Sequence, residues 1–256
     1  MKLTRRAAAG ASAAAALLAV TAIVATRPAF EGHDGSAQCA NALTRCAGPV
    51  REPRARVTDF HSADFGSVHP AADVRRIADW IAASGDNAGA SFIIVDKVHA
   101  RAYVFDADAR LRAASPVLLG SARGDETVPG IGSRPIAQVR PEQRTTPAGR
   151  FVAERGHNAR GETVLWVDYD AAVSMHRVLT TEPRERRLQR LASPTESDNR
   201  ISYGCINVPV KFFENYVWPT VAYGRAIVYV LPEIKSLKEV FGSYAVAHEP
   251  DLAPAD

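Results

Sequence analysis

The pattern of apolar and polar positions predicts one helix followed by a series of short strands. In residues 73–84, apolar side chains recur at helical spacing, with Asp73 as the candidate cap and Gly85 as the stop signal. Beyond residue 90, short apolar runs alternate with polar turns, which is typical of β-structure. These runs are expected at residues 91–96, 102–106, 114–119, 151–153, 164–167, 171–175, 201–208 and 226–231. The sequence therefore predicts a β-rich, mixed α+β fold with a few short helices.

Two more helices and one long loop complete the pattern. Residues 182–191 are arginine-rich and helical in character, and residues 210–217 follow Pro209, which suits a first helical turn. Residues 120–149 are rich in Gly, Pro and Arg, and so long a loop in a compact domain is more often functional than idle. The chain divides into a linker and N-terminal helix, a main domain, and a tail that is either a short helix or a loose end, at residues 27–88, 89–235 and 236–256.

The first 26 residues have the pattern of an export signal. Basic residues Lys2, Arg5 and Arg6 precede an uncharged stretch rich in Ala, Leu and Val. That stretch is also about long enough to span a bilayer, so an uncleaved membrane anchor is the alternative. The pair of arginines leaves both the Sec and the twin-arginine routes open. We expect an exported protein of the periplasm or cell envelope.

Charge and cysteine content narrow the class of protein. Lys and Arg number 31 against 28 Asp and Glu, and the two signs are interspersed, which argues against a nucleic-acid binder. Cys39 and Cys46 lie close together and suit a small disulfide in an oxidising compartment, which leaves Cys205 as the free thiol. No paired Cys/His spacing supplies a zinc site, so we expect neither a metal nor a cofactor.

Cys205 and His176 are the candidate reactive pair. A cysteine attacks a carbonyl as a thiolate, so its pKa must be lowered by a histidine or a helix N-terminus. His176 ends an earlier apolar run and suits the role of general base, while the helix after Pro209 is expected to place its dipole near the thiol. The alternative is that Cys205 is a small, inert, buried side chain.

The neighbours of Cys205 strengthen its candidacy. Gly204 removes a side chain beside the thiol, which lets backbone N–H groups approach a developing oxyanion. Ser202 and Asn207 are polar and are expected to orient the loop or to bind substrate.

The run Ser202-Tyr203-Gly204-Cys205-Ile206-Asn207 resembles the signature of the L,D-transpeptidase catalytic domain (YkuD-like) family. That signature reads Ser/Thr-His-Gly-Cys, a hydrophobic residue and Asn or Arg, after an upstream His. The segment Thr146-Pro147-Ala148-Gly149 is similar to the family's Thr-Pro-x-Gly turn. Lys97, residues 102–105 and the Gly120 turn are similar to its opening hairpin, so the resemblance covers about residues 91–231.

The resemblance implies an L,D-transpeptidase-type β-sandwich with Cys205 as nucleophile and His176 as general base. The backbone N–H groups of Tyr203, Gly204 and Cys205 would form the oxyanion hole, and the carbonyl of Arg177 would orient the histidine. Ser202 and Asn207 would shape the site.

The implied activity is that of an exported cysteine acyltransferase acting on peptidoglycan stem peptides. It would form a thioester at the cysteine and transfer the acyl group to an amine, which makes a cross-link. The alternatives are an L,D-carboxypeptidase, a protein-to-wall anchoring enzyme and a non-catalytic cell-wall binding protein. Another exported cysteine peptidase or amidase is less well matched, because such enzymes usually place the cysteine before the histidine.

Three features depart from the family pattern. Tyr203 replaces the usual histidine, so we expect activity to be retained with changed substrate contacts. Arg177 replaces a small residue, which predicts a narrower or more basic pocket. The segment after His176 is longer than usual, and its Arg184 and Arg187 are candidates for binding stem-peptide carboxylates. The alternative is a solvated helix whose acidic residues balance the charge.

Overall fold

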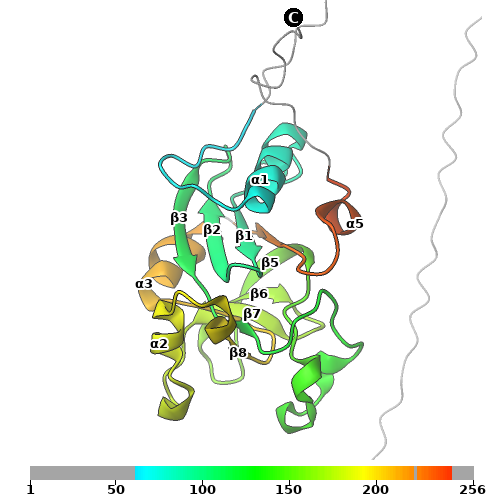
Figure 1. The fold of residues 1–256 in the computed structure, drawn as a ribbon, viewed down its shortest axis with the longest axis vertical. Coiled ribbons are helices and arrows are strands. Elements are labelled where there is room, and N and C mark those ends of the chain that lie inside the picture. The colour runs from blue at the N-terminus through cyan, green and yellow to red at the C-terminus, as the bar shows by residue number, and fades with distance from the viewer. Residues whose placement is uncertain (1–60, 222–223, 244–256) are drawn as a thin grey trace, which may run out of the picture. The chain divides into compact units, whose positions relative to one another are not determined.

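The structure is a computed structural model that describes residues 61–221 and 224–243 (Figure 1). The expected export segment, residues 1–26, and the candidate pair Cys39 and Cys46 lie outside the described residues. Within the described ranges, no helix combines the length and the apolar character needed to cross a bilayer.

The described part of the chain is built around two β-sheets. One eight-stranded sheet has the order β3-β2-β1-β10-β5-β6-β7-β9, and β4 pairs with β8 in a small second sheet. The strands are β1 Phe92–Asp96, β2 Arg101–Phe105, β3 Leu111–Pro116, β4 Leu119–Gly120, β5 Gly149–His157, β6 Thr163–Asp168, β7 Val173–Arg177, β8 Arg200–Ser202, β9 Ile206–Val208 and β10 Ala226–Val230.

The helices are short, apart from α1. They are α1 Ala72–Ser84, α2 Arg187–Ala192, α3 Val210–Phe212, α4 Trp218–Thr220 and α5 Leu237–Phe241. Single 3₁₀ turns occur at η1 Ile131–Ser133, η2 Ile136–Gln138, η3 Pro141–Gln143, η4 Pro183–Glu185 and η5 Glu196–Asn199, and a π-helical turn at η6 Phe213–Val217. The expected β-rich, mixed α+β class with few short helices is confirmed.

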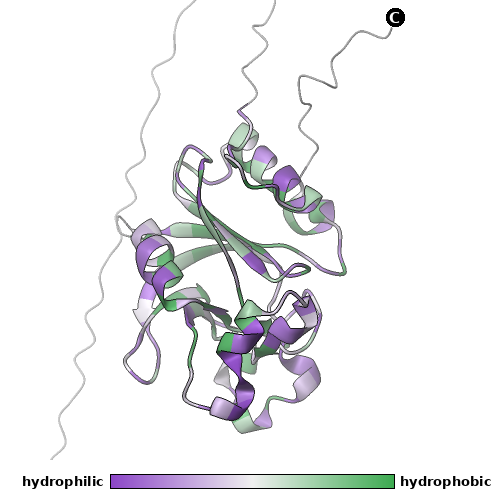
Figure 2. Cartoon of the chain, turned by 60° about the vertical axis from the view of Figure 1, so that its left-hand side comes forward, coloured by the Kyte–Doolittle hydropathy of each residue, from purple (hydrophilic) through white to green (hydrophobic). Residues whose placement is uncertain are grey.

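The large sheet folds over on itself around the main hydrophobic core. Ile93 and Val104, from β1 and β2, share this core with Leu165, Met175 and Ile206, from β6, β7 and β9. Strands far apart in the sheet order therefore face one another across a single layer of apolar side chains. Figure 2 shows much of the hydrophobic colour on strands in the interior of the described part of the chain. The pairs β1–β10 and β7–β9 are parallel, and the other neighbouring strands of this sheet are antiparallel.

A second core lies on the other face of β1, β2 and β10, under helix α1. Ile77 and Ile81 are completely buried there against Phe92 and Tyr229, and each such isoleucine contributes about 1.5–3 kcal/mol. Leu237 of α5 belongs to the same core. The expected domain boundaries, 89–235, therefore leave out two elements that pack on the sheet.

The N-terminus of α1 differs from the expectation, whereas its C-terminus agrees with it. Asp73 was the wrong cap, because the N-cap position is Ala71 and the Asp73 carboxylate instead pairs with Arg76 at 2.8 Å. Gly85 ends the helix in the left-handed conformation, as its position after the last periodic residue predicted.

Three element boundaries were wrong in ways that matter for the site. The expected helix 182–191 is two pieces, η4 and α2, because Arg186 between them has a φ of 51°. The expected strand 201–208 is divided into β8 and β9 by a turn that carries residues 203–205. The expected helix 210–217 continues through α3, η6 and α4 to Thr220.

Candidate active site

The pairing of two parallel strands brings His176 and Cys205 together. His176 lies near the end of β7, and Cys205 directly precedes β9. In the register of this pair, His176 lies beside Asn207. Ser174 is on the same face of β7 as His176, because side chains two residues apart in a strand point the same way. Its hydroxyl oxygen lies 3.7 Å from the sulfur of Cys205.

The thiol and the imidazole shift each other's protonation. Burial of the thiol alone would raise the pKa of Cys205, but the hydrogen bond and charge of His176 lower it, with help from Ser174, and the net direction is downward. Burial alone would lower the pKa of His176, but the interaction with Cys205 outweighs it, and the net direction is upward. Both shifts favour a thiolate beside an imidazolium.

The orientation of His176 is fixed by the residue that follows it. Its Nδ1 atom lies 2.8 Å from the carbonyl oxygen of Arg177. A carbonyl oxygen only accepts, so Nδ1 carries the proton and donates it. The other ring nitrogen, Nε2, is then the one available to exchange a proton with the thiol.

Gly204 is required by the backbone at this turn. Its φ is +129°, and a Cβ atom there would lie 2.7 Å from the carbonyl oxygen of Thr145. Its N–H group donates to the hydroxyl of Ser202 at 3.1 Å, and that hydroxyl donates to the carbonyl of Cys205 at 2.6 Å. The N–H of Gly204, expected in the oxyanion hole, is therefore already engaged in this conformation.

Ser202 and Asn207 both hold the cysteine turn, residues 203–205, from inside the protein. Ser202 is 3% exposed and Asn207 is fully buried, so neither presents a free surface to a ligand. The side-chain amide of Asn207 donates to the carbonyl of Cys205 at 3.3 Å, as the hydroxyl of Ser202 does.

Thr146 and Ser174 are residues to which sequence reasoning gave no role. The buried hydroxyl of Thr146 accepts the N–H of Gly120 at 2.9 Å and donates to the carbonyl of Gly204 at 2.8 Å. The Thr-Pro-x-Gly segment and the Gly120 turn were both visible as motifs, but their contact with the cysteine turn depends on the fold. Gly120 must be a glycine, since a Cβ there would lie 2.2 Å from the carbonyl oxygen of Arg144.

The side chain of Tyr203 is partly exposed and packs against an arginine. The ring is 39% exposed, and the guanidinium of Arg144 lies over it, 4.0 Å from the ring centroid. The backbone of Tyr203 thus forms part of the turn, and its ring forms a cation–π pair with Arg144.

The arginines lie differently from the expectation. Arg177, which was expected to make the pocket narrower or more basic, points its side chain to the opposite face from His176 and pairs with Glu214 at 3.1 Å. Arg187 is 13% exposed and is engaged by Glu185 and by the side-chain oxygen of Asn207. Arg184 is exposed on η4.

A strand, and not a helix, directly follows Cys205. The expected helix dipole beside Cys205 was wrong, because the extended strand β9 separates the thiol from the first helical residue, Val210. In residues 61–221 and 224–243, no group of three or more His, Cys, Asp or Glu side chains is placed to hold a metal ion.

Comparison with known proteins yields structural likenesses. No family model matches the sequence, and no curated protein matches it. Among solved structures, the chain is similar to a point mutant of the Enterococcus faecium L,D-transpeptidase, with 14% identity over 56% of this chain and 50% of that one, and a TM-score of 0.33. It is also similar to the catalytic domain of the E. faecium enzyme, with 17% identity over 55% and 96% and a TM-score of 0.31.

The helical cell shape determining protein Pgp2 from Campylobacter jejuni is a third similar structure. Identity is 16% over 61% of this chain and 55% of that one, with a TM-score of 0.36. The chain thus spans about half the length of two of these three proteins.

Proposed function

We propose that this protein is a cysteine-dependent acyltransferase in which Cys205 is the nucleophile and His176 the general base. The observation that carries the proposal is the pairing of β7 with β9, which places His176 beside the residues around Cys205; the lowered pKa of Cys205 and the raised pKa of His176 agree with it. The hydrogen bond from His176 to the Arg177 carbonyl adds the orienting third group. Nucleophile, base and orienter in hydrogen-bonding sequence are the arrangement of covalent acyl transfer.

The first half-reaction follows from this pair. The thiolate of Cys205 attacks the substrate carbonyl carbon, and the resulting oxyanion is met by the backbone N–H of Cys205, since that of Gly204 is engaged by Ser202. The tetrahedral intermediate collapses, the amide C–N bond breaks, and His176 gives its proton to the leaving amine. A thioester remains on Cys205, and His176 is left neutral.

The second half-reaction returns the enzyme to its starting state. An incoming amine attacks the thioester carbonyl while neutral His176 removes its proton. The carbon–sulfur bond then breaks, and the thiolate leaves beside the regenerated imidazolium. Water as acceptor gives hydrolysis instead, and an amine on a protein gives attachment of that protein.

The proposed substrate is the peptidoglycan stem peptide. The support is the resemblance of residues 202–207 to the L,D-transpeptidase signature, together with the export signal expected at residues 1–26. Cleavage of a tetrapeptide stem before its terminal D-alanine would release that D-alanine. Arg184 is exposed and is the proposed contact for a stem carboxylate, whereas Arg187 would act through Asn207.

The test is to incubate the purified full chain with disaccharide-tetrapeptides and to follow the products by mass spectrometry. We expect release of D-alanine together with a cross-linked dimer, and a covalent carbapenem adduct that maps to Cys205. Cys205→Ala removes both, and His176→Gln slows both. His157→Ala is the matched control, because His157 is exposed at the end of β5.

The products separate the possible acceptors. D-alanine release with hydrolysed stems and no dimer would identify a carboxypeptidase. Neither D-alanine release nor a carbapenem adduct would refute the enzymatic proposal and leave a cell-wall binding protein. An adduct that survives in Cys205→Ala would refute the nucleophile.

A further inference from the structure

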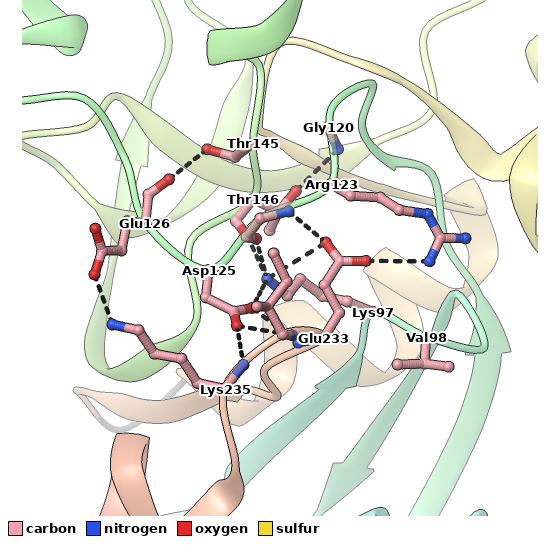
Figure 3. A network of polar contacts seen from close by, with 12 residues as sticks. Lys97, Val98, Gly120, Arg123, Asp125, Glu126, Thr145, Thr146, Glu233 and Lys235 are labelled. Atoms are coloured by element: carbon pink, nitrogen blue, oxygen red, sulfur yellow. Dashed lines mark hydrogen bonds and ion pairs between the residues drawn. The ribbon is translucent and has the colours of Figure 1, made fainter.

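A buried cluster of four charged residues lies behind the cysteine turn. Lys97 directly follows β1, and its side chain is completely buried (Figure 3). Its ammonium group lies 2.8 Å from the carboxylate of Asp125 and 3.7 Å from that of Glu233. It also donates to the carbonyl oxygens of Gly124 and Thr146, the latter at 3.0 Å. These contacts use all three protons of the ammonium group.

Glu233 connects this lysine to a second cation. Its carboxylate is 1% exposed and accepts from Arg200 at 2.6 Å and from the N–H of Gly124 at 2.9 Å. Arg200 in turn donates to the backbone carbonyl of Lys97 at 2.8 Å. Two cations and two carboxylates are therefore buried as one neutral group, which we call the Lys97 network: Lys97, Asp125, Arg200 and Glu233.

The Lys97 network is connected to the cysteine turn, residues 203–205, by two routes. On the first route, Lys97 holds the carbonyl of Thr146, whose hydroxyl donates to the carbonyl of Gly204 at 2.8 Å. On the second route, Arg200 is the first residue of β8, the strand that leads directly into residues 203–205. The residue before the nucleophile and the strand that delivers it are thus tied to the same buried charges.

We propose that the Lys97 network is a positioning device that sets the geometry, and so the reactivity, of Cys205. It exchanges no proton with the substrate and does not touch the thiol. Burying four charges is costly, and apolar side chains of similar volume often stabilise a protein at least as well. The network instead fixes the orientation of backbone groups. Lys97 holds the carbonyl of Thr146, and the hydroxyl of Thr146 holds the carbonyl of Gly204. The inference rests on the proposed nucleophile but not on the peptidoglycan substrate.

The experiment measures the rate at which iodoacetamide alkylates Cys205 in the full chain as a function of pH, with the site identified by peptide mapping. Thr146→Val keeps the shape of the side chain but loses its hydrogen bonds. We expect it to lower the rate at neutral pH by about tenfold, the effect of losing the one hydrogen bond that reaches the carbonyl of Gly204. Thr146→Ser restores the hydroxyl and should stay within about twofold of wild type. Lys97→Met should lower the rate at least as much as Thr146→Val.

A matched control separates positioning from stability. Asp86 binds Tyr229 and Arg150 in a polar group on the other core, away from Cys205. Asp86→Asn should lower the melting temperature and leave the alkylation profile unchanged. If Thr146→Val or a folded Lys97→Met is destabilised but alkylates like wild type, the proposal is overturned. If Lys97→Met does not fold, the contrast between Thr146→Val and Thr146→Ser decides.

The two proposals fail in different ways. A wild-type protein whose Cys205 is alkylated rapidly, but which releases no D-alanine from tetrapeptides, would refute the proposed substrate. The Thr146 contrast would still test the Lys97 network in that protein, because alkylation needs no substrate.

Discussion

Asp125 should make the folded state sensitive to acid in a defined range of pH. Burial alone would raise its pKa, but hydrogen bonds from Lys97 and from the N–H groups of residues 233–235 lower it from 3.8 to about 2. A shift of about 1.8 pH units at 1.36 kcal/mol per unit corresponds to about 2.5 kcal/mol of stability. Because the pKa is lower in the folded protein, this stability is present above the unfolded value, 3.8, and is lost as pH falls toward 2.

Urea unfolding followed by circular dichroism measures this contribution in wild type and Asp125→Asn between about pH 6 and pH 2. At the upper end we expect the variant to be less stable by about 3–5 kcal/mol, because Lys97 loses its nearest counter-charge while Glu233 remains. As pH falls to about 2, the difference between the two proteins should shrink by about 2 kcal/mol, since Asp125 is then almost fully protonated in the unfolded wild type and half protonated in the folded wild type.

Asp73→Asn is the control for other carboxylates. Asp73 forms an exposed ion pair with Arg76, and such pairs contribute about 0–1 kcal/mol. Its pH profile should therefore stay close to that of wild type. A difference between wild type and Asp125→Asn that is constant over the whole range would refute the reasoning, because it would mean that Asp125 titrates alike in the folded and unfolded chains.

Two further predictions concern the cysteine turn. Gly204→Ala should lower stability by about 1–3 kcal/mol from its backbone conformation alone, with a further loss from the contact with Thr145, and should slow alkylation of Cys205. Thermal melts should show a much smaller loss of stability for the control Gly130→Ala, where a Cβ meets open space. Equal losses in the two variants would contradict the close contact at Gly204. Ser174→Ala removes a group that lowers the pKa of Cys205, so the midpoint of its alkylation profile should move to higher pH, and an unchanged midpoint would exclude Ser174 from activation of the thiol.

The approximate positions of the strands and of helix α1, and the proximity of His176 to Cys205, could be predicted from the sequence. These features depend on local periodicity and on a short motif. The direction of the Arg177 side chain could also have been predicted from the sequence. If His176 faces the site from a strand, its neighbour must face the other way. The expected basic pocket treated the two residues as if they shared a face.

The Lys97 network and the bridge through Thr146 could not be read from the chain. The four charged residues of the network are far apart in sequence, and they meet only because β1, β8, the 120–149 loop and the segment after β10 converge. The break at Arg186 carries no local signal, because a positive φ at a non-glycine residue is imposed by tertiary contacts. The division of residues 201–208 into two strands could not be predicted, because the sequences of both halves are strand-like.

The parallel register of β7 and β9 sets the spacing between His176 and Cys205. His176 lies beside Asn207, and Met175 beside Ile206, with the apolar member of each strand in the main core. A slip of β9 by one residue would turn Ile206 out of that core and carry Cys205 to the wrong face. The spacing between His176 and the sulfur of Cys205 is therefore maintained by the same apolar side chains that fold the protein. Mutations that weaken the packing of β9 should therefore lower the reactivity of the Cys205 thiol before they unfold the chain.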